Sequence, residues 1–383
     1  MATITTTTVV GNAQSPKGAA PTLKLSNSIS RQPVKVDPGK HIAAQKGVEI
    51  LKMKDLNPNF TSPISEHAAA QIPLATREAV IEMRRELFSR EVLDNCLHST
   101  RPGAVQLRGH SPRFTKFIYD FWHHPQVLEA VSRAAGVDLV PAYDYEIAST
   151  NVQLGPDGIA GLYNTPAEPL QSQDIPDNKP TNQPKRDPII GWHRDAHPFV
   201  CVLMLSDAQH MKGGETAYRR SDGEIAYIKA PQMGWGAILQ GRYITHMGIP
   251  ASGGTGERIV CVTSFRPRNP ALPDSTVLDQ IRKHSHHTEI YYQYTLYRVE
   301  VLQERMRLMA EALRGRYAEN TREGGAGCCL KETVDKRELE AWAREQMGYL
   351  RVTYEQVNKS DPHPVRLEDC WGVEGEGDEF NQI

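Results

Sequence analysis

Three residues of this sequence have the types and the spacing of a metal site. His193 and Asp195 are separated by one residue, and His246 follows further along the chain. Because alternate residues of an extended chain project to the same side, His193 and Asp195 can share one ion while Arg194 points away. The third ligand must come from a different strand, and His246 follows a predicted strand and a turn at Gly241. Two imidazoles and one carboxylate form the facial triad that holds Fe(II) and leaves coordination positions open, although Zn(II) could also occupy such ligands.

Other histidines compete for this interpretation, because the chain contains 14 of them. His287 and Glu289 form a second such pair, but the one suitable histidine after it is His363, and no glycine pair or arginine strand accompanies it. We interpret this pair as a solvated helix start. His197 extends the first motif to His-x-Asp-x-His, which hints at a hydrolytic metal site. That use would leave His246 without a role.

The composition is that of an ordinary globular protein, long enough for one large catalytic domain or two small ones. The 383 residues are 39% hydrophobic and 23% charged, with a formal net charge of −2. This charge gives no electrostatic reason to expect nucleic acid or a membrane surface as a partner, and no apolar run reaches the length of a membrane span. The six cysteines show no Cys-x-x-Cys spacing. Free thiols in the reducing cytoplasm are therefore expected, and the oligomeric state stays open.

The pattern that must position the candidate ligands changes along the chain. Residues 1–40 are predicted to be a disordered tail; their early lack of acidic residues is shared with transit peptides, but no amphipathic stripe accompanies it. Residues 41–383 are predicted to form a single catalytic domain. It consists of a helical layer over 65–136, a β core over 143–268 and C-terminal helices over 274–357.

The helical layer is predicted from apolar spacing over 65–99, from Ser111-Pro112 as a helix start, and from a helix over 125–135 that ends at Gly136. Short apolar runs between turns favour a barrel or a sandwich in the middle of the chain. Six strands are predicted there, over 145–154, 198–205, 216–219, 224–229, 236–240 and 258–265. Two helices are predicted to follow, over 276–315 and 331–356, the second broken near Gly348.

A long interval rich in proline and glycine, 155–188, directly precedes the first histidine of the motif. A loop of that length within a compact domain is usually functional or disordered. Two interpretations of this interval are open: a lid over the site, and a mobile insertion without a role.

Arg258 begins the last strand of the core, twelve positions after His246. An arginine at the start of a buried strand needs a partner, and its planar guanidinium binds a carboxylate through two parallel hydrogen bonds. The distal carboxylate of 2-oxoglutarate would supply one. A structural ion pair with Glu257 or Glu215 is the alternative, and Arg266, on the same strand face, is the reserve candidate.

The order of these motifs resembles the core of the Fe(II)/2-oxoglutarate-dependent dioxygenase superfamily. His193-x-Asp195 is followed by Gly213-Gly214-Glu215-Thr216, then by His246 and Arg258, within residues 151–266. The Gly-Gly-Glu-Thr element is similar to that of the prolyl-4-hydroxylase-like branch. The resemblance implies an α+β fold with a double-stranded β-helix core, of jelly-roll or cupin type, and flanking N- and C-terminal helices. It also implies catalytic Fe(II) on the triad, 2-oxoglutarate held by Arg258, and O₂ as a co-substrate.

Two positions depart from that branch. Arg258 stands where the best-known collagen hydroxylases use lysine, and Leu154 stands where the branch often has a tyrosine. Asn151 and Gln153 share a strand face and are candidate contacts for 2-oxoglutarate or substrate; an exposed edge-strand face is the alternative.

The implied activity is oxidation of an unactivated C–H bond by hydroxylation, desaturation or oxidative cyclisation, coupled to decarboxylation of 2-oxoglutarate to succinate and CO₂. The expected substrate is a small molecule, derived from an amino acid or belonging to natural-product biosynthesis. A prolyl-type hydroxylase of proteins and a non-catalytic β-barrel binding module are the alternatives.

Overall fold

The structure is a computed structural model that describes residues 34–43, 50–101, 104–154, 157–171, 191–228, 232–253, 257–322, 329 and 331–359. The predicted tail lies mostly outside these residues, and the interval 155–188 is described only over 157–171. None of the helices in these ranges is both long and apolar enough to cross a membrane.

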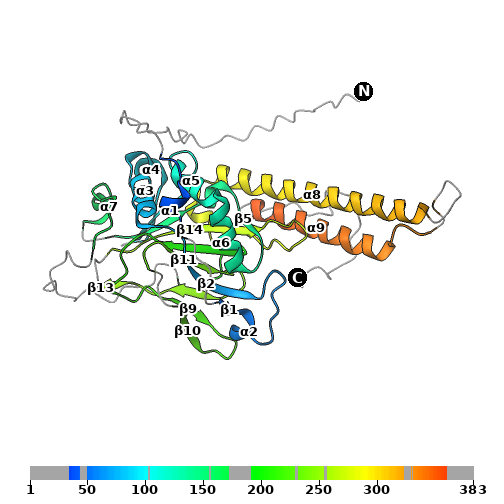
Figure 1. The fold of residues 1–383 in the computed structure, drawn as a ribbon, viewed down its shortest axis with the longest axis horizontal. Helices are drawn as coiled ribbons and strands as arrows, with labels where there is room; N and C mark the ends of the chain where they lie inside the picture. The colour runs from blue at the N-terminus through cyan, green and yellow to red at the C-terminus, as the bar shows by residue number, and fades with distance from the viewer. Residues whose placement is uncertain are drawn as a thin grey trace, which may run out of the picture.

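An antiparallel sheet of nine strands, the large sheet, organises the molecule (Figure 1). Its strand order is β1-β2-β11-β7-β14-β6-β4-β3, and β5 also pairs with β14. The strands are β1 (Ile50–Lys52), β2 (His67–Pro73), β3 (Leu97–Arg101), β4 (Ala104–Leu107), β5 (Leu139–Pro141), β6 (Ser149–Gln153), β7 (Phe199–Met204), β11 (Trp235–Leu239) and β14 (Ile259–Pro267). With the helices below, this gives an α+β architecture.

A three-stranded antiparallel sheet, the small sheet, faces the large one. It has the order β10-β9-β12, from β9 (Thr216–Arg219), β10 (Ile225–Ile228) and β12 (His246–Gly248). A hydrophobic cluster joins Val200 and Leu239 of the large sheet to Tyr218 of the small sheet. We call the side of the large sheet that carries these residues its inner face. Two short strands, β8 (Met211–Lys212) and β13 (Ser252–Gly253), form a separate pair.

Helices cover the outer face of the large sheet. They are α3 (Arg77–Leu87), α4 (Arg90–Cys96), α5 (Lys116–His123) and α6 (Pro125–Ala135), and they share one hydrophobic core with β7, β11 and β14. The Trp122 ring of α5 packs edge-on against Phe265 of β14, with centroids 5.9 Å apart. The predicted end of α6 is confirmed, since Gly136 takes the left-handed conformation at φ 69°. Short helices complete this part: α1 (Pro38–His41), α2 (Met53–Leu56), α7 (Gly158–Leu162) and the 3-10 turn η1 (Asp144–Glu146).

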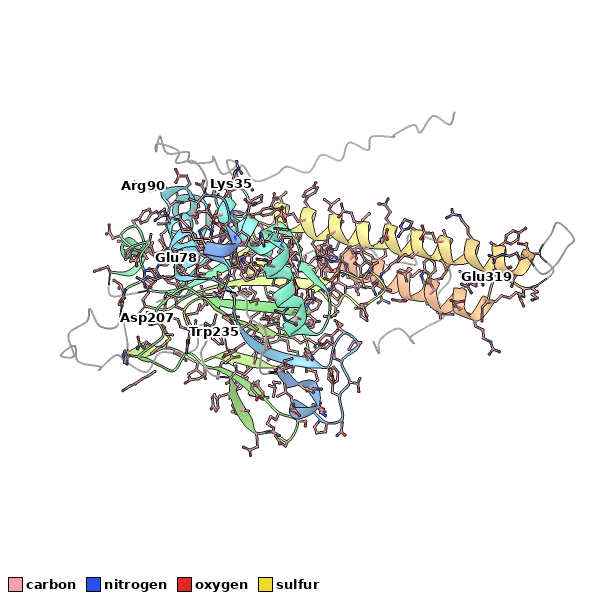
Figure 2. All side chains as sticks on the ribbon, in the orientation of Figure 1. Lys35, Glu78, Arg90, Asp207, Trp235 and Glu319 are labelled. Carbon is pink, nitrogen blue, oxygen red and sulfur yellow. The ribbon has the colours of Figure 1, made fainter. Side chains whose placement is uncertain are left out.

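The last two helices form a hairpin that extends beyond the sheets (Figure 1). They are α8 (His287–Arg322) and α9 (Lys336–Asn358), preceded by the 3-10 turn η3 (Arg282–His284); Glu319 of α8 lies far from the sheets (Figure 2). The buried Arg298 of α8 joins the two helices, because its Nε donates to Thr353 Oγ1 at 2.7 Å and its guanidinium lies 3.6 Å from the Tyr349 ring centroid.

All six predicted strands of the middle of the chain exist, and five of them have nearly the predicted ends. The strand predicted over 145–154 begins only at Ser149, because residues 144–146 form η1. Four predictions about helices were wrong. The helix predicted over 276–315 begins only at His287, after the 3-10 turn η3, and continues to Arg322. Residues 67–73 and 97–101 are strands, because the first pairs with β11 and β1 and the second with β4. Ser111-Pro112 is a cis peptide bond in a turn, and α5 begins only after Thr115. Helix α9 runs through Gly348 without a break.

Candidate metal centre and its surroundings

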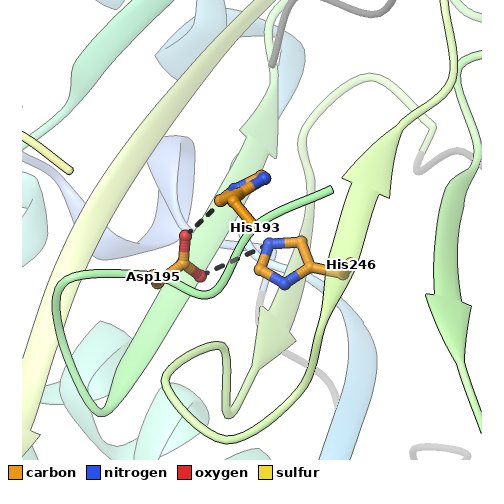
Figure 3. A group of neighbouring side chains, drawn as sticks. All are labelled: His193, Asp195 and His246. Atoms are coloured by element: carbon orange, nitrogen blue, oxygen red, sulfur yellow. Dashed lines mark ion pairs between the residues drawn. The ribbon is translucent and has the colours of Figure 1, made fainter. Parts of the chain in front are cut away.

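His193, Asp195 and His246 meet in one place, as their spacing predicts (Figure 3). The backbones of the two histidines pair with each other, with His193 N donating to His246 O at 3.0 Å and His246 N donating to His193 O at 2.9 Å. His193 thus extends the small sheet at β12. One potential ligand atom from each residue lies within 4.8 Å of the other two, and no other such group of three forms among the described residues. The exposed Arg194 points away, toward Thr245.

Both imidazoles are oriented by the backbone. Nδ1 of His193 donates to the carbonyl oxygen of Gly191 at 2.7 Å, and Nδ1 of His246 donates to that of Ile244 at 2.9 Å. Each Nε2 then lies 3.5 Å from a different oxygen of Asp195. A hydrogen bond from the non-coordinating nitrogen is how proteins usually hold a metal-binding histidine in one tautomer. Sequence reasoning did not identify these carbonyl groups.

The charge states suit metal binding. Burial tends to raise the pKa of Asp195, but the charges of His246 and His193 outweigh it, so the pKa lies below its usual value and the carboxylate is ionised. Burial lowers the pKa of His246, against the opposing charge of Asp195. For His193 burial acts in the same direction, but the hydrogen bond and charge of Asp195 prevail and raise the pKa. A metal ion would therefore compete with a proton mainly at His193.

Gly241 fits against the aspartate. The Asp195 amide donates to the Gly241 carbonyl at 3.0 Å, and a Cβ on Gly241 would lie 1.7 Å from Asp195 Oδ2. A side chain at this position cannot coexist with the carboxylate in its present place.

Arg258 is an arginine without an acidic partner among the described residues. Its Nε is buried and makes no hydrogen bond, and burial lowers its pKa to about 10. Glu257 instead binds Arg84 of α3 through both carboxylate oxygens, at 2.6 and 3.0 Å. The predicted alternative, a structural pair with Glu257 or Glu215, is therefore not observed. Arg258 immediately precedes β14.

The reserve candidate, Arg266, lies near the other end of β14, about 26 Å along an extended strand from Arg258. Its guanidinium lies 5.1 Å from the centroid of the Tyr297 ring, and its hydrogen bonds reach backbone carbonyls only. Arg258 and Arg266 thus lie at opposite ends of β14, in different surroundings.

Asn151 and Gln153 lie on the inner face, in a strand that has neighbours on both sides. Because β6 lies between β14 and β4, the edge-strand alternative was wrong. Asn151 Oδ1 accepts a hydrogen bond from Gln106 Nε2 at 2.7 Å, and the backbone N–H of Gln153 donates to the backbone carbonyl of Arg258 at 3.0 Å. Gln106 was missed because it lies within the predicted helical layer, where no strand was predicted; its buried Oε1 has no partner among the described residues.

His197 belongs to a buried polar cluster rather than to the triad. Its Nδ1 lies 4.0 Å from an oxygen of Glu146, which forms an ion pair with Arg108 and accepts a hydrogen bond from Ser264 Oγ at 3.4 Å. The hydrolytic His-x-Asp-x-His site is therefore not assembled. No sequence signal joins Arg108, Glu146 and Ser264, because they come from distant segments.

The second histidine pair is a helix start, as predicted. His287 is exposed at the first position of α8, and its Nε2 lies 3.1 Å from the carbonyl of Arg282. His363 lies outside the described residues.

Comparisons with known proteins give structural neighbours only. No protein-family model matches the sequence, and no curated protein matches it. The solved structures similar to this chain include a prolyl-4-hydroxylase from Pseudomonas putida, 16% identical, which covers 53% of this chain and 94% of its own at a TM-score of 0.31. A 2OG-Fe(II) oxygenase family oxidoreductase from Burkholderia pseudomallei is 13% identical, with coverages of 51% and 91% and a TM-score of 0.32. The non-haem α-ketoglutarate-dependent epimerase SnoN of nogalamycin biosynthesis is 12% identical, with coverages of 52% and 78% and a TM-score of 0.34.

Proposed function

We propose that this protein is a non-haem Fe(II)/2-oxoglutarate-dependent oxygenase that oxidises an unactivated C–H bond of a small molecule. The observation that carries the proposal is the cluster of His193, Asp195 and His246, whose ligand atoms lie within 4.8 Å of one another. Two imidazoles and an ionised carboxylate are the donor set of the facial triad, which leaves coordination positions open. Fe(II) bound there would supply activation of O₂.

The path of the chain supports a double-stranded β-helix as the core of a single catalytic domain over 41–383. From β6 onward the strands alternate between the two sheets: β6 and β7 belong to the large sheet, β9 and β10 to the small, β11 to the large, β12 to the small and β14 to the large. The triad comes from the small sheet and the segment that extends it, and Arg258 directly precedes the central strand of the large one. Such a core holds a site between its sheets.

Arg258 supports 2-oxoglutarate as the co-substrate. Arg258 has a buried Nε without a hydrogen-bond partner and no acidic partner among the described residues. Such an arrangement is costly, and a carboxylate that binds the guanidinium through two hydrogen bonds offsets the cost. Gln153 lies beside Arg258 across the sheet, and Asn151 is the next residue on the same face, so we assign both to binding of 2-oxoglutarate or substrate. The role of the chain in this step is to hold the dicarboxylate in one orientation toward the triad.

The proposed overall reaction is R–H + 2-oxoglutarate + O₂ → R–OH + succinate + CO₂. For desaturation or ring closure the substrate loses two hydrogens and water is formed in place of the hydroxyl group. The substrate is proposed to be an amino-acid-derived or natural-product molecule. We place the enzyme in the cytoplasm, since Cys96, Cys201 and Cys261 are buried free thiols that suit a reducing compartment.

The triad is tested by metal binding and by succinate formation. Wild-type protein with Fe(II), 2-oxoglutarate and O₂ is expected to release succinate, and His246→Ala is expected to lose both bound iron and succinate. His287→Ala is the matched control, because this histidine is exposed and lies outside the triad. If the wild-type protein binds no iron and forms no succinate, the result would favour the alternative that the protein is a non-catalytic binding module. Turnover that responds to proline-containing peptides alone would identify a protein hydroxylase.

Arg258→Ala separates co-substrate binding from metal binding. Loss of two charge-assisted hydrogen bonds is expected to weaken 2-oxoglutarate binding by about 100-fold, while iron affinity stays that of the wild type. Arg268→Ala is the control, since Arg268 pairs with Asp138 on the surface. Isothermal titration with 2-oxoglutarate and Mn(II) measures both quantities. An unchanged affinity of Arg258→Ala for 2-oxoglutarate would show that another arginine binds the co-substrate.

A further inference from the structure

Helices α8 and α9 form a hairpin that extends beyond the sheets (Figure 1), and both helices carry large apolar side chains that are exposed. The exposed face of a helix in a globular protein is normally polar. Exposed apolar side chains that lie next to one another mark a site of interaction. The contacts between the two helices define the direction in which each of these side chains points.

On α8, an exposed apolar residue directly follows each residue that contacts α9. The contacting residues, which form hydrogen bonds or ion pairs with α9, are Arg298, Arg305 and Arg316. The exposed residues that follow them are Val299, Met306 and Tyr317. Successive residues of a helix point about 100° apart, so these three side chains form one stripe beside the contact with α9. The exposed Tyr292, two helical turns before Val299, continues the stripe toward the sheets.

The same pattern occurs on α9. The residues that contact the three arginines include Glu338, Gln346 and Tyr349. The exposed apolar residues that follow them are Leu339, Met347 and Leu350. Each stripe is thus turned about 100° from the partner helix, in the same sense along its own chain. Because the two helices run antiparallel, these equal turns bring both stripes to the same side of the hairpin.

We call this side of the hairpin the apolar hairpin face. The other residues that the helical repeat places on it carry no charge, and they include Leu302, Gln303, Ala310, Leu313 and Ala343. Charged residues border the face instead, as they border the apolar seam of a coiled coil. Such a face fits another pair of helices with the same pattern, because apolar residues then meet apolar residues along its whole length.

The area of the apolar hairpin face suits a second copy of the hairpin. Helix widths of about 10 Å, with stripe lengths of about 38 Å on α8 and about 25 Å on α9, give an area of roughly 650 Å². Paired with an equal surface, the face would bury about 1,300 Å² in total, and stable protein–protein interfaces bury about 1,200–2,000 Å². The interfaces of homodimers are also the more apolar ones.

Charges at the edge of α8 favour an antiparallel arrangement of two copies. Glu300 and Arg307 border the face on the side away from α9, and Arg307 also pairs with Glu304 and Glu311 of its own helix. In parallel copies, like charges would lie opposite each other at both positions. In antiparallel copies centred between the two residues, Glu300 of each copy lies opposite Arg307 of the other. That centre is also the middle of the stripe on α8.

We propose that two copies of this chain associate through the apolar hairpin face and form an antiparallel four-helix bundle. The two-fold axis passes near Gln303, so the two Gln303 amides lie opposite each other and can satisfy each other's hydrogen bonds. The sheets and the metal centres of the two copies then lie at opposite ends of the bundle.

Sedimentation equilibrium of the full-length protein at micromolar concentrations tests the interface. The wild type is expected to be a dimer, and Met306→Glu/Met347→Glu to dimerise at least about 100-fold more weakly, because the dimer would bury unpaired carboxylates. Leu308→Glu/Val352→Glu is the matched control and is expected to dimerise like the wild type. It makes the same change of charge at side chains that are 36% and 37% exposed but are turned to the other side of the hairpin. Circular dichroism checks that both variants keep their helices. A monomeric wild type would overturn the proposal, and so would equal dimerisation of the two double variants.

A charge exchange tests the antiparallel arrangement. Glu300→Arg places like charges opposite each other at two symmetric positions and is expected to weaken dimerisation by about tenfold. Glu300→Arg/Arg307→Glu restores opposite charges and is expected to recover most of the loss. A double variant that dimerises no better than Glu300→Arg would contradict the antiparallel pairing.

Discussion

Gly241 is the residue whose replacement tests the metal centre most directly, because it contacts a ligand without being one. A methyl group there would lie 1.7 Å from Asp195 Oδ2, so Gly241→Ala must displace the carboxylate. Shifts of metal-supporting groups typically cost 10–100-fold in metal affinity, and we expect a loss of about 100-fold for Fe(II). Gly248→Ala in β12 is the control, since no atom lies within 4 Å of its new Cβ. Titration with Fe(II) under anaerobic conditions measures both; equal affinities would show that Asp195 is not a ligand.

At this scale the triad was predictable, because residue type and strand parity are local properties of the sequence. The groups that complete the site were not. The carbonyls of Gly191 and Ile244, each two residues before its histidine, orient the imidazoles through the local backbone conformation, which the residue types do not specify. Likewise, Arg258 has no acidic partner among the residues that the structure describes, because Glu257 binds Arg84, an interaction with a helix far away in the sequence.

Between elements, the ion pair of Arg84 and Glu257 connects helix α3 to the start of β14. Arg84 is fully buried, and Glu257 also accepts a hydrogen bond from Ser206 at 3.0 Å. Removing one partner of a buried pair leaves an uncompensated charge, so Glu257→Ala is expected to lower the free energy of unfolding by about 3–5 kcal/mol. The exposed Glu311, paired with Arg307 on α8, provides the control, and Glu311→Ala should leave stability unchanged. Chemical denaturation measures both; a loss below about 1 kcal/mol for Glu257→Ala would contradict this account.

Helices and strands could be predicted from the sequence where their pattern is local. The prediction failed where pairing with a distant segment decides the structure. The core strands alternate or are continuously apolar between turns, and all six were found. Residues 67–73 were included in the predicted helix because the apolar spacing that follows them is helical, yet register with Trp235–Leu239 makes them a strand. Sheet pairing between segments so far apart has no signature in either segment alone.

For the molecule as a whole, the residues proposed to bind the metal and the co-substrate come from both sheets. The small sheet supplies His246 and the large sheet, through the segment before β14, supplies Arg258, so the site forms only when both sheets have assembled. Its parts are therefore not separable into a smaller functional fragment. Acid conditions test the integrity of this assembly, because several buried groups bind protons differently in the folded and unfolded states.

The buried His110 and the half-buried His98 should make the protein less stable as the pH falls. Burial lowers the pKa of both His98 and His110 to about 4, so the unfolded chain takes up their protons first, near pH 6.5. Stability is therefore complete above pH 6.5 and decreases toward pH 4, by about 1.4 kcal/mol per pH unit for each histidine. Glu86 acts oppositely: burial raises its pKa to about 7, so its contribution decreases as the pH rises from about 4.5 to 7.

Variants of these groups isolate each contribution to the pH dependence. Between pH 4.5 and 6.5 the effects of the two histidines oppose the effect of Glu86, which leaves a net difference of one proton. These three groups together should therefore raise the free energy of unfolding by about 1.4 kcal/mol for each unit by which the pH increases. His110→Gln should reduce the slope measured for the wild type by about one proton. Glu86→Gln should increase it by the same amount, because the opposing carboxyl is gone. Guanidinium unfolding at five pH values measures these slopes. A slope unchanged in His110→Gln would mean that His110 is protonated alike in both states, against its full burial between Thr115 and Ala148.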